Sequence, residues 1–248
     1  MNPAEFANIA ASEQDFWWYR GMRAILFRLL DPIARSGRFE RVLEAGCGTG
    51  HLSTVFAERY RWTMFPLDLG SEGLSYARNM GVGRLTQGDI RALPFPDGAF
   101  DAVLSMDVIV HLERGREEEA IAEFARVLKP GGLLVLRASA LDVLRSRHSE
   151  FAHERQRFTR ARLTDAVTSR GFRVERITYL NSLLMPVALF KFRVWEPLTG
   201  AQPQSGVQSV APWLDRLLYL PLRVEAGWIG RGGSFPAGQS LVLVGRKD

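Results

Sequence analysis

Short apolar runs alternate with amphipathic segments between residues 41 and 181 of this 248-residue chain. The runs have the length of buried strands, and the segments between them carry apolar residues at helical spacing, as in Ile121, Phe124 and Val127. Such alternation is typical of an α/β fold with a doubly wound parallel sheet. Strands are predicted at Arg41–Ala45, Arg61–Leu67, Arg84–Gln87, Phe100–Met106, Leu133–Arg137 and Phe172–Tyr179, with a further β-like run at Ser240–Gly245; helices are predicted at Leu52–Tyr60, at Leu74–Met80, around Ile121–Leu128 and after an N-cap at Thr159.

Two segments fall outside this alternation. Ser12–Leu30 has the pattern of an amphipathic helix rich in aromatic residues. About sixty residues separate the last two strand-like runs, too many for a simple loop, so helices are expected there over Leu183–Trp195 and Trp213–Ile229, joined by a polar linker at Gly200–Gln208. The chain is therefore divided into an N-terminal helical cap (1–40), a core (41–180), a helical insertion (181–237) and the last strand of the core sheet (238–248).

Composition and charge narrow the class of protein. With 46% hydrophobic and 24% charged residues, the chain resembles an ordinary globular domain. The net charge of +5 is carried almost entirely by arginines scattered among acids, which favours a solvated surface over a nucleic-acid-binding patch. No apolar run is long enough to span a membrane and no leader peptide is recognisable, so a cytoplasmic location is expected. The histidines lack metal-ligand spacing, and no metal site is predicted.

A glycine-rich turn follows the first predicted strand. Gly46, Gly48 and Gly50 alternate with other residues between an apolar strand and a helix. Such a turn lets the backbone approach a ligand closely, and its amides can bind a carboxylate. A dinucleotide site has its third glycine one residue later, so this spacing disfavours a nicotinamide cofactor.

Acidic residues follow the next two strands. Asp68 ends the second, where a carboxylate can accept hydrogen bonds from both hydroxyls of a ribose. Asp89 follows the third and can accept from an adenine amino group, while Ile90 packs on the ring. Because the carboxyl ends of neighbouring parallel strands share one edge of a sheet, these groups are expected to line one ligand site.

Taken together, these motifs resemble the class I S-adenosylmethionine (SAM)-dependent methyltransferase family. They are Glu44-Ala45-Gly46-Cys47-Gly48-Thr49-Gly50, Asp68, Gly88-Asp89-Ile90, Leu93–Asp101 and Leu128-Lys129-Pro130-Gly131-Gly132. The resemblance implies a Rossmann-like, seven-stranded mixed sheet whose last strand is antiparallel and inserted beside the fifth. It also implies SAM as cofactor, with Gly46, Cys47, Gly48, Gly50 and Glu44 at the methionine end, Asp68 and Leu69 at the ribose, Asp89 and Ile90 at the adenine, and Met106 near the sulfonium.

Four further residues are weighed for direct roles. His111 falls on the loop where acceptors approach in the family, so it is a candidate general base; otherwise it is a helix-start or hydrogen-bonding residue. Cys47 has no base placed beside it by the motif, which disfavours a nucleophilic role. Tyr19 and Arg20 lie in the aromatic segment before the first strand, which in the family commonly folds over the cofactor; contact with SAM or the acceptor and simple packing both remain open.

The resemblance implies methyl transfer by in-line displacement, which needs alignment of the nucleophile more than a catalytic base. Members that methylate DNA adenine or glutamine amides carry an Asn/Asp-Pro-Pro motif after the fourth strand, whereas this chain has Ser105–Val108 there. A small-molecule acceptor is therefore predicted, with no nucleic-acid partner. The alternative is a non-catalytic SAM-binding protein that acts as a sensor or partner.

The insertion at 181–237 is predicted to form an apolar lid or interface on the acceptor side. Its two apolar runs are flanked by Arg193, Arg216 and Arg223, a mixture suited to a lipid-like acceptor and to peripheral contact with a membrane surface. The alternative is that both runs pack on the sheet or on each other. The oligomeric state is left open.

Overall fold

The computed structural model describes residues 2–37, 39–200, 202–207 and 210–248, so the predicted linker at Gly200–Gln208 lies partly outside the described residues. The chain divides into two compact units, and each unit consists of three segments. The first unit contains Met1–Gly37, Ala140–Glu154 and Thr178–Ser240; the second contains Arg38–Ser139, Arg155–Ile177 and Leu241–Asp248.

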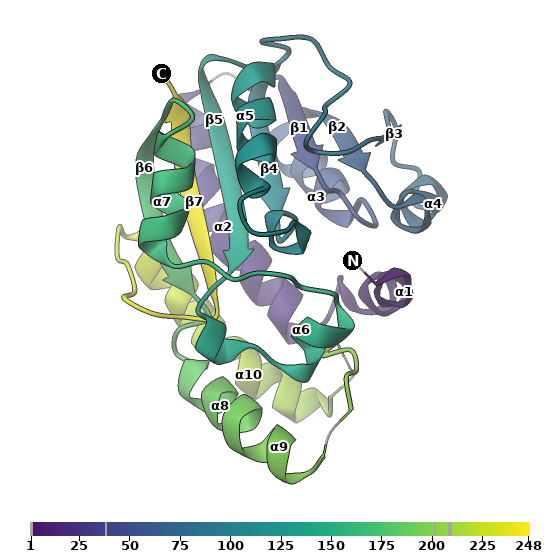
Figure 1. Cartoon of the computed structure of the whole chain (residues 1–248), viewed down its shortest axis with the longest axis vertical. Coiled ribbons are helices and arrows are strands. Elements are labelled where there is room, and N and C mark those ends of the chain that lie inside the picture. Colours follow the sequence, from purple (N-terminus) through teal and green to yellow (C-terminus); the bar gives the residue numbers. More distant parts are fainter. Residues whose placement is uncertain (1, 38, 201, 208–209) are drawn as a thin grey trace. The chain divides into compact units, whose positions relative to one another are not determined.

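The second unit is built on a seven-stranded sheet with the order β3-β2-β1-β4-β5-β7-β6 (Figure 1). Its strands are β1 (Arg41–Ala45), β2 (Thr63–Asp68), β3 (Thr86–Gln87), β4 (Phe100–Met106), β5 (Leu128–Ser139), β6 (Phe172–Leu180) and β7 (Ser240–Lys247). Neighbouring strands from β3 to β5 pair in parallel, whereas β7 runs opposite to β5 (Figure 1). The predicted mixed sheet, with its last strand inserted beside the fifth, is confirmed.

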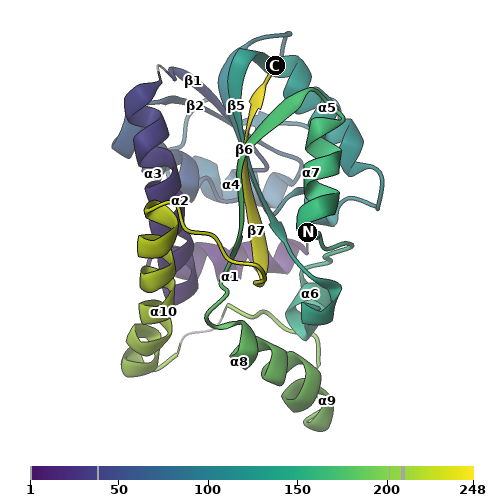
Figure 2. The same cartoon turned by 90° about the vertical axis from the view of Figure 1, so that its left-hand side faces the viewer.

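Helices cover both faces of this sheet, which explains why its central strands are apolar on both sides. Side chains such as Leu43 on β1, Val103 on β4 and Leu134 on β5 are completely buried. Figure 2 shows α3 on one face and α5 and α7 on the other. These helices are α3 (His51–Tyr60), α4 (Ser71–Asn79), α5 (Glu117–Val127) and α7 (Arg160–Thr168). The predicted N-cap of α7 is confirmed, because the Thr159 side chain accepts a hydrogen bond from the Arg162 amide.

Several strands end one or two residues later than predicted, and three strands, β2, β3 and β5, begin at other residues than predicted. Arg61 and Arg84 adopt left-handed φ angles of 60° and 55°, which extended strands exclude, so β2 and β3 begin later than predicted. In contrast, β5 begins earlier, at Leu128. The motif Leu128-Lys129-Pro130-Gly131-Gly132 forms the irregular start of this strand, with Gly131 at φ 71° and a shift in the β4–β5 register.

The first unit is helical, and its N-terminal helix differs from the prediction. Instead of one helix over Ser12–Leu30, the chain forms α1 (Pro3–Ser12) and α2 (Trp17–Ser36). The Arg23 guanidinium on α2 reaches back to the carbonyl oxygens of Glu13 and Gln14, so side-chain hydrogen bonds hold the break between the two helices. The unit also contains η2 (Asp142–Leu144), α6 (Arg147–Phe151), α8 (Met185–Phe190), the π-helical turn η3 (Lys191–Trp195), α9 (Glu196–Leu198) and α10 (Pro212–Gly230).

Helices α2 and α10 form a closely packed parallel pair, seen side by side in Figure 2. The Trp17 amide donates to Asp215 at 2.9 Å, and Arg20 forms an ion pair with Asp215 at 3.2 Å. Further along, Gly21 lies so close to Leu222 that an added Cβ would overlap the leucine side chain. Residue numbers of the contact partners rise in the same direction along both helices, so the two helices run parallel. Part of the predicted insertion therefore packs against the N-terminal segment.

In the part of the chain that the structure describes, no helix combines the length and apolar character needed to cross a membrane.

Candidate functional site

The carboxyl ends of β1, β2, β3 and β4 meet at one edge of the sheet. The strand register places Ala45 opposite Leu67 and Asp68 opposite Gln87. The predicted glycine turn, Asp68 and Asp89 leave the sheet at this edge, where open α/β sheets bind their ligands. Backbone hydrogen bonds reinforce the alignment: the Gly46 amide donates to the Leu67 carbonyl at 2.7 Å, and the Gly88 amide to the Asp68 carbonyl at 3.0 Å.

The glycine turn requires glycine for conformational and steric reasons. Gly46, Gly48 and Gly50 have φ angles of 89°, 54° and 78°, in the region that favours glycine. A Cβ on Gly46 would overlap the side chain of Val108. The turn thus depends on glycine both for its backbone conformation and for its close packing against neighbouring side chains.

Several amides of this turn are already used within the protein. Those of Gly46 and Cys47 donate to the Leu67 carbonyl, that of Gly48 to the Asp68 carboxylate at 2.8 Å, and that of Gly50 to the Cys47 carbonyl at 2.9 Å. These four groups hold the shape of the turn. The sequence predicted that they could bind a ligand carboxylate; the structure gives them a partner in the protein instead.

Asp68 is the residue that joins the turn to β2. Its two carboxylate oxygens accept from the amides of Gly48 and Gly70, both at 2.8 Å. Burial raises the pKa of Asp68, and these two amides oppose that shift. A carboxylate oxygen can accept more than one hydrogen bond, so both oxygens of Asp68 can still accept from the two hydroxyls of a ribose.

Two residues at the base of the turn are deeply buried. Glu44 on β1 is buried and accepts a hydrogen bond from the Ser53 hydroxyl of α3. The neighbouring Cys47 is also buried, and desolvation together with the charges of Glu44 and Asp68 raises its pKa. The Cys47 thiol therefore stays protonated at neutral pH, which disfavours a nucleophilic role.

Asp89, predicted at the adenine, is paired with a neighbouring cation. Both of its carboxylate oxygens accept from the Arg91 guanidinium, at 2.5–3.1 Å, and this bond lowers the pKa of Asp89. Ile90 is buried beside it, while Leu69 exposes 66% of its surface at the end of β2.

The end of β4 carries an ion pair between a half-buried aspartate and a buried arginine, which the sequence motifs alone did not reveal. Asp107 follows Met106, has a left-handed φ of 58°, and accepts from Nε of Arg137 on β5 at 2.8 Å. Arg137 is buried, and the second oxygen of Asp107 has no hydrogen-bond partner among the described residues. The signal was present in the sequence, because an arginine inside an apolar strand needs a charged partner. His111 lies close by in the chain, half-buried at the end of η1 (Ile109–His111).

Tyr19 and Arg20 lie on α2 in the first unit. Arg20 pairs with Asp215 and stacks over the Tyr219 ring, 4.4 Å from its centroid. Tyr19 makes edge contacts with Trp18 and Phe16. These contacts account for packing within the unit, and a role for both residues at the cofactor stays a prediction.

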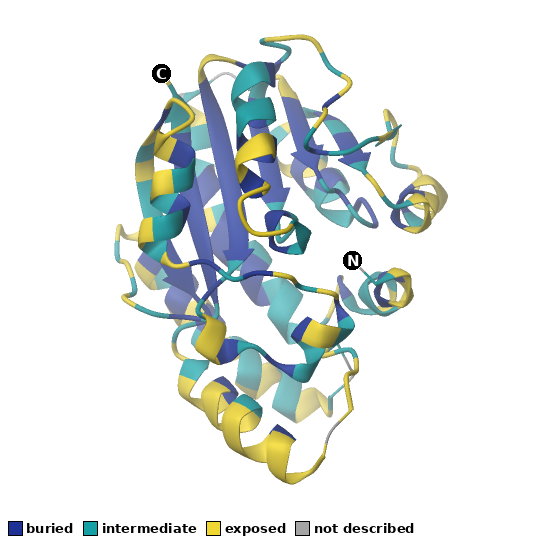
Figure 3. Cartoon of the chain, viewed as in Figure 1, coloured by how far each residue is buried: buried dark blue, intermediate teal, exposed yellow. Residues whose placement is uncertain are grey.

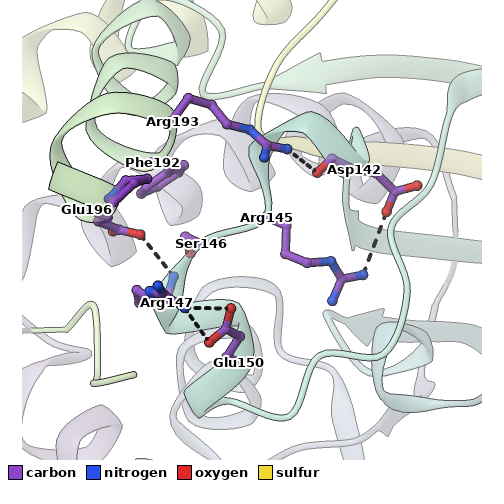
Figure 4. Close-up of a pocket in the computed structure, with 9 residues that line it drawn as sticks. Asp142, Arg145, Ser146, Arg147, Glu150, Phe192, Arg193 and Glu196 are labelled. Atoms are coloured by element: carbon purple, nitrogen blue, oxygen red, sulfur yellow. Dashed lines mark hydrogen bonds and ion pairs between the residues drawn. The ribbon is translucent and has the colours of Figure 1, made fainter. Parts of the chain in front are cut away.

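The first unit also contains a cleft of about 250 Å³ (Figure 4). Its charged lining consists of Arg145, Arg147, Arg193, Asp142, Glu150 and Glu196. Arg145 pairs with Asp142 at 3.7 Å and Arg147 with Glu150 at 3.1 Å, while Nε of Arg193 donates to the Val143 carbonyl at 2.7 Å. Equal numbers of opposite charges thus neutralise one another, and the cleft lacks the net charge of an ion-binding site. Among the described residues, no cluster of three or more His, Cys, Asp or Glu side chains is arranged to hold a metal ion.

The sheet order and the ligand edge define a Rossmann-like protein with a nucleoside site, and comparison with known proteins narrows the class. A family model described as "Methyltransferase domain" matches residues 43–136. Malonyl-[acyl-carrier protein] O-methyltransferase of Serratia marcescens is 30% identical over 207 residues, which cover 82% of this chain and 78% of that protein. Fatty-acid O-methyltransferase of Mycolicibacterium smegmatis is 42% identical over 97 residues, 38% of this chain and 35% of that protein. The chain thus spans less than half the length of some of the curated relatives it matches.

A solved structure supports the fold over nearly the whole chain. A SAM-dependent methyltransferase from Archaeoglobus fulgidus superposes with a TM-score of 0.61 at 17% identity, covering 95% of this chain and 97% of that one. Because the Serratia marcescens relative is 30% identical over 82% of this chain, the chain belongs to the class I SAM-dependent methyltransferase family, and its cofactor is S-adenosylmethionine. The Asp68 carboxylate, which can accept further hydrogen bonds, fits the ribose of this cofactor.

Proposed function

We propose that the protein transfers the methyl group of SAM to a small-molecule carboxylate by in-line displacement. The observation that carries the cofactor part of this proposal is the hydrogen-bonded junction of the glycine turn with Asp68 at the ligand edge. The acceptor part is supported by the names of two relatives, a fatty-acid O-methyltransferase and a malonyl-[acyl-carrier protein] O-methyltransferase. A fatty acid and a malonyl group both carry a free carboxyl group.

A carboxylate acceptor makes the chemistry simple. It is ionised at neutral pH and needs no base to remove a proton. SAM supplies a methyl group activated by the positive sulfur. The acceptor oxygen bonds to the methyl carbon as the carbon–sulfur bond breaks, and the sulfur retains the bonding electrons as a neutral thioether. The protein has to align the acceptor and exclude water.

The proposed roles follow the order of the residues along the ligand edge. Gly46, Cys47, Gly48 and Gly50, with Glu44, shape the methionine end; Asp68 and Leu69 lie at the ribose, Asp89 and Ile90 at the adenine, and Met106 near the sulfur. The unpaired oxygen of Asp107 is an acceptor for a donor group on the cofactor. The insertion at 181–237 recognises the apolar part of the acceptor, and His111 serves as a base only where that acceptor is a hydroxyl.

The test is a methylation assay with chemically matched acceptors. The protein is incubated with SAM and, separately, with a fatty acid, a malonyl thioester, a fatty alcohol and a fatty amine, and methylated products are identified by mass spectrometry. We expect methyl esters of the acids, formed equally well by His111→Ala. Loss of this activity in His111→Ala, or methylation of the alcohol alone, would contradict the carboxylate proposal.

The Asp68 assignment has its own measurement. Asp68→Ala removes two charge-assisted hydrogen bonds that shape the turn, each worth about 1.5–3 kcal/mol. SAM affinity measured by calorimetry should therefore fall at least about tenfold, while Asp165→Ala, at an exposed position of α7, should bind normally. Tight SAM binding without turnover on any acceptor would favour the alternative of a non-catalytic SAM-binding protein.

A further inference from the structure

One side of α10 is apolar and exposed along its whole length. The exposed side chains are Trp213, Leu217, Leu220, Val224 and Trp228, and they recur every three or four residues, which places them on one stripe. Their exposed fractions range from 52% for Leu220 to 68% for Trp213. At 1.5 Å per residue the stripe is about 22 Å long. Figure 3 shows exposed residues along α10 and also on α8 and α9.

The opposite side of α10 is occupied by packing within the first unit. Leu222, Ala226 and Ile229 are buried there, and Leu222 contacts Gly21 of α2. The stripe is therefore not the side on which α10 is held in the fold. An exposed stripe of this size on a helix marks a surface that meets an apolar partner.

Acidic and basic residues lie on different sides of α10. Both acidic residues face inward, since Asp215 pairs with Arg20 and Glu225 is completely buried. The exposed charged residues beside the stripe, Arg216, Arg223 and Arg231, are all basic. An apolar face with tryptophan near both ends and a rim of arginines is the arrangement of helices that lie in the interface of an anionic bilayer.

We propose that α10 docks the protein on anionic membrane surfaces, with its axis parallel to the bilayer plane. The stripe enters the boundary between headgroups and acyl chains, and Arg216, Arg223 and Arg231 pair with lipid phosphates. A second copy of the chain is the less suitable occupant, because apposed stripes would bring two sets of arginines together without acids. Docking requires no methyl transfer and is tested independently of it.

Exposed apolar residues also occur on the α8 to α9 segment of the same unit. Phe190, Trp195 and Leu198 are 59%, 58% and 79% exposed. Lys191 lies in the same segment, with its ammonium group 5.8 Å from the centre of the Phe192 ring. This segment repeats the combination of aromatic and basic residues found on α10.

The experiment measures sedimentation of the full-length protein with lipid vesicles. One set is phosphatidylcholine alone, and the other is phosphatidylcholine with an equal amount of phosphatidylglycerol. We expect the protein to sediment with the anionic vesicles, to sediment less at high salt, and to bind the zwitterionic vesicles at least about tenfold more weakly.

Variants separate the apolar and basic parts of the surface. The triple variant Leu217→Gln, Leu220→Gln, Val224→Gln and the double variant Arg216→Gln, Arg223→Gln should each lower partition onto anionic vesicles at least about tenfold. Matched controls are Met80→Gln, at the exposed apolar residue that follows α4, and Arg78→Gln, at an exposed arginine in the last turn of α4. Both should bind like the wild type. All substituted side chains are exposed, so thermal melting should confirm that the variants fold.

Failure of the folded wild-type protein to sediment with the anionic vesicles would overturn the proposal. Equal sedimentation of the wild type and the triple variant would also overturn it. A third contradicting result is a wild-type protein that is dimeric by light scattering and does not bind vesicles, together with a triple variant that is monomeric. In that case α10 would bind a second copy of the chain.

Discussion

Glu225 is a carboxylate enclosed in the helical unit. It is completely buried on α10 and accepts a hydrogen bond from the Leu183 amide at 2.7 Å. Its second oxygen, Oδ1 of Asn181 and the Ser182 hydroxyl have no hydrogen-bond partner among the described residues. Burial raises the pKa of Glu225, because the charged form loses its hydration. The residue thus fastens the chain after β6 to α10, but its charge opposes folding.

This shift predicts the sign of a pH effect. A folded-state pKa above the unfolded value means that the contribution of Glu225 to stability is complete below the ordinary glutamate pKa and is lost as the pH rises through the folded value. Glu225→Gln keeps an acceptor for the Leu183 amide and removes the charge. We expect the variant to be more stable than the wild type by about 1–3 kcal/mol at neutral pH, with the difference vanishing near pH 4.

Thermal melting of both proteins across this pH range measures the effect. Glu72→Gln, at an exposed position of α4, is the control and should show no comparable trend. A stability difference between Glu225→Gln and the wild type that stays constant with pH would contradict the assignment of the shift to this carboxylate.

Among the elements, the α2–α10 pair depends on one missing side chain. Gly21 allows the helices to approach until Leu222 fills the position of its Cβ. Gly21→Ala should destabilise the protein by about 1–3 kcal/mol through overpacking, despite the better helix propensity of alanine. For a protein of this size that corresponds to a melting temperature lower by at least about 2 °C.

A double-mutant cycle checks that the contact is the cause. Leu222→Ala alone leaves a cavity, but combined with Gly21→Ala it should recover part of the loss, so the two effects should not add. Gly227→Ala on α10 meets only ordinary van der Waals contact and is the matched control, expected to be neutral or stabilising. Simple additivity would show that the two helices are not limited by this contact.

The elements also show which features the sequence could reveal. β1 and β4 were predicted with correct bounds because they are buried apolar runs. Asp68 could be placed at the end of β2 because it follows such a run. The break between α1 and α2 could not be predicted, since it depends on Arg23 binding carbonyls about ten positions earlier. The burial of the Leu222 side chain and the exposure of the Leu220 side chain likewise depend on packing against α2, which no local sequence pattern encodes.

At the scale of the whole molecule, the predicted cofactor residues are divided between two units. The glycine turn, Asp68, Asp89 and Met106 belong to the second unit, and Tyr19 and Arg20 to the first. Hydrogen exchange measured with and without S-adenosylhomocysteine distinguishes their roles. We expect protection around residues 44–50, 68–70 and 88–90, and also at 17–23 if the segment before β1 closes on the cofactor.

The control for this measurement is Asp68→Ala, which should lose protection in both units at the same ligand concentration. Protection confined to the second unit would show that Tyr19 and Arg20 serve packing on α10 and do not touch the cofactor. Protection in neither unit, at saturating ligand, would contradict the cofactor site itself.

The pairing of α2 with α10 also affects how the protein is made. The amide of Trp17 and the carboxylate of Asp215 are 198 positions apart in the chain. At about 5–20 residues per second, a ribosome releases α2 about 10–40 s before its partner helix. Throughout that interval α2 lacks α10, the helix against which Trp17, Arg20 and Gly21 pack in the finished protein. Helix α2 is therefore synthesised well before its partner helix, and the yield of folded protein in cells should depend on chaperones that shield α2 until α10 is made.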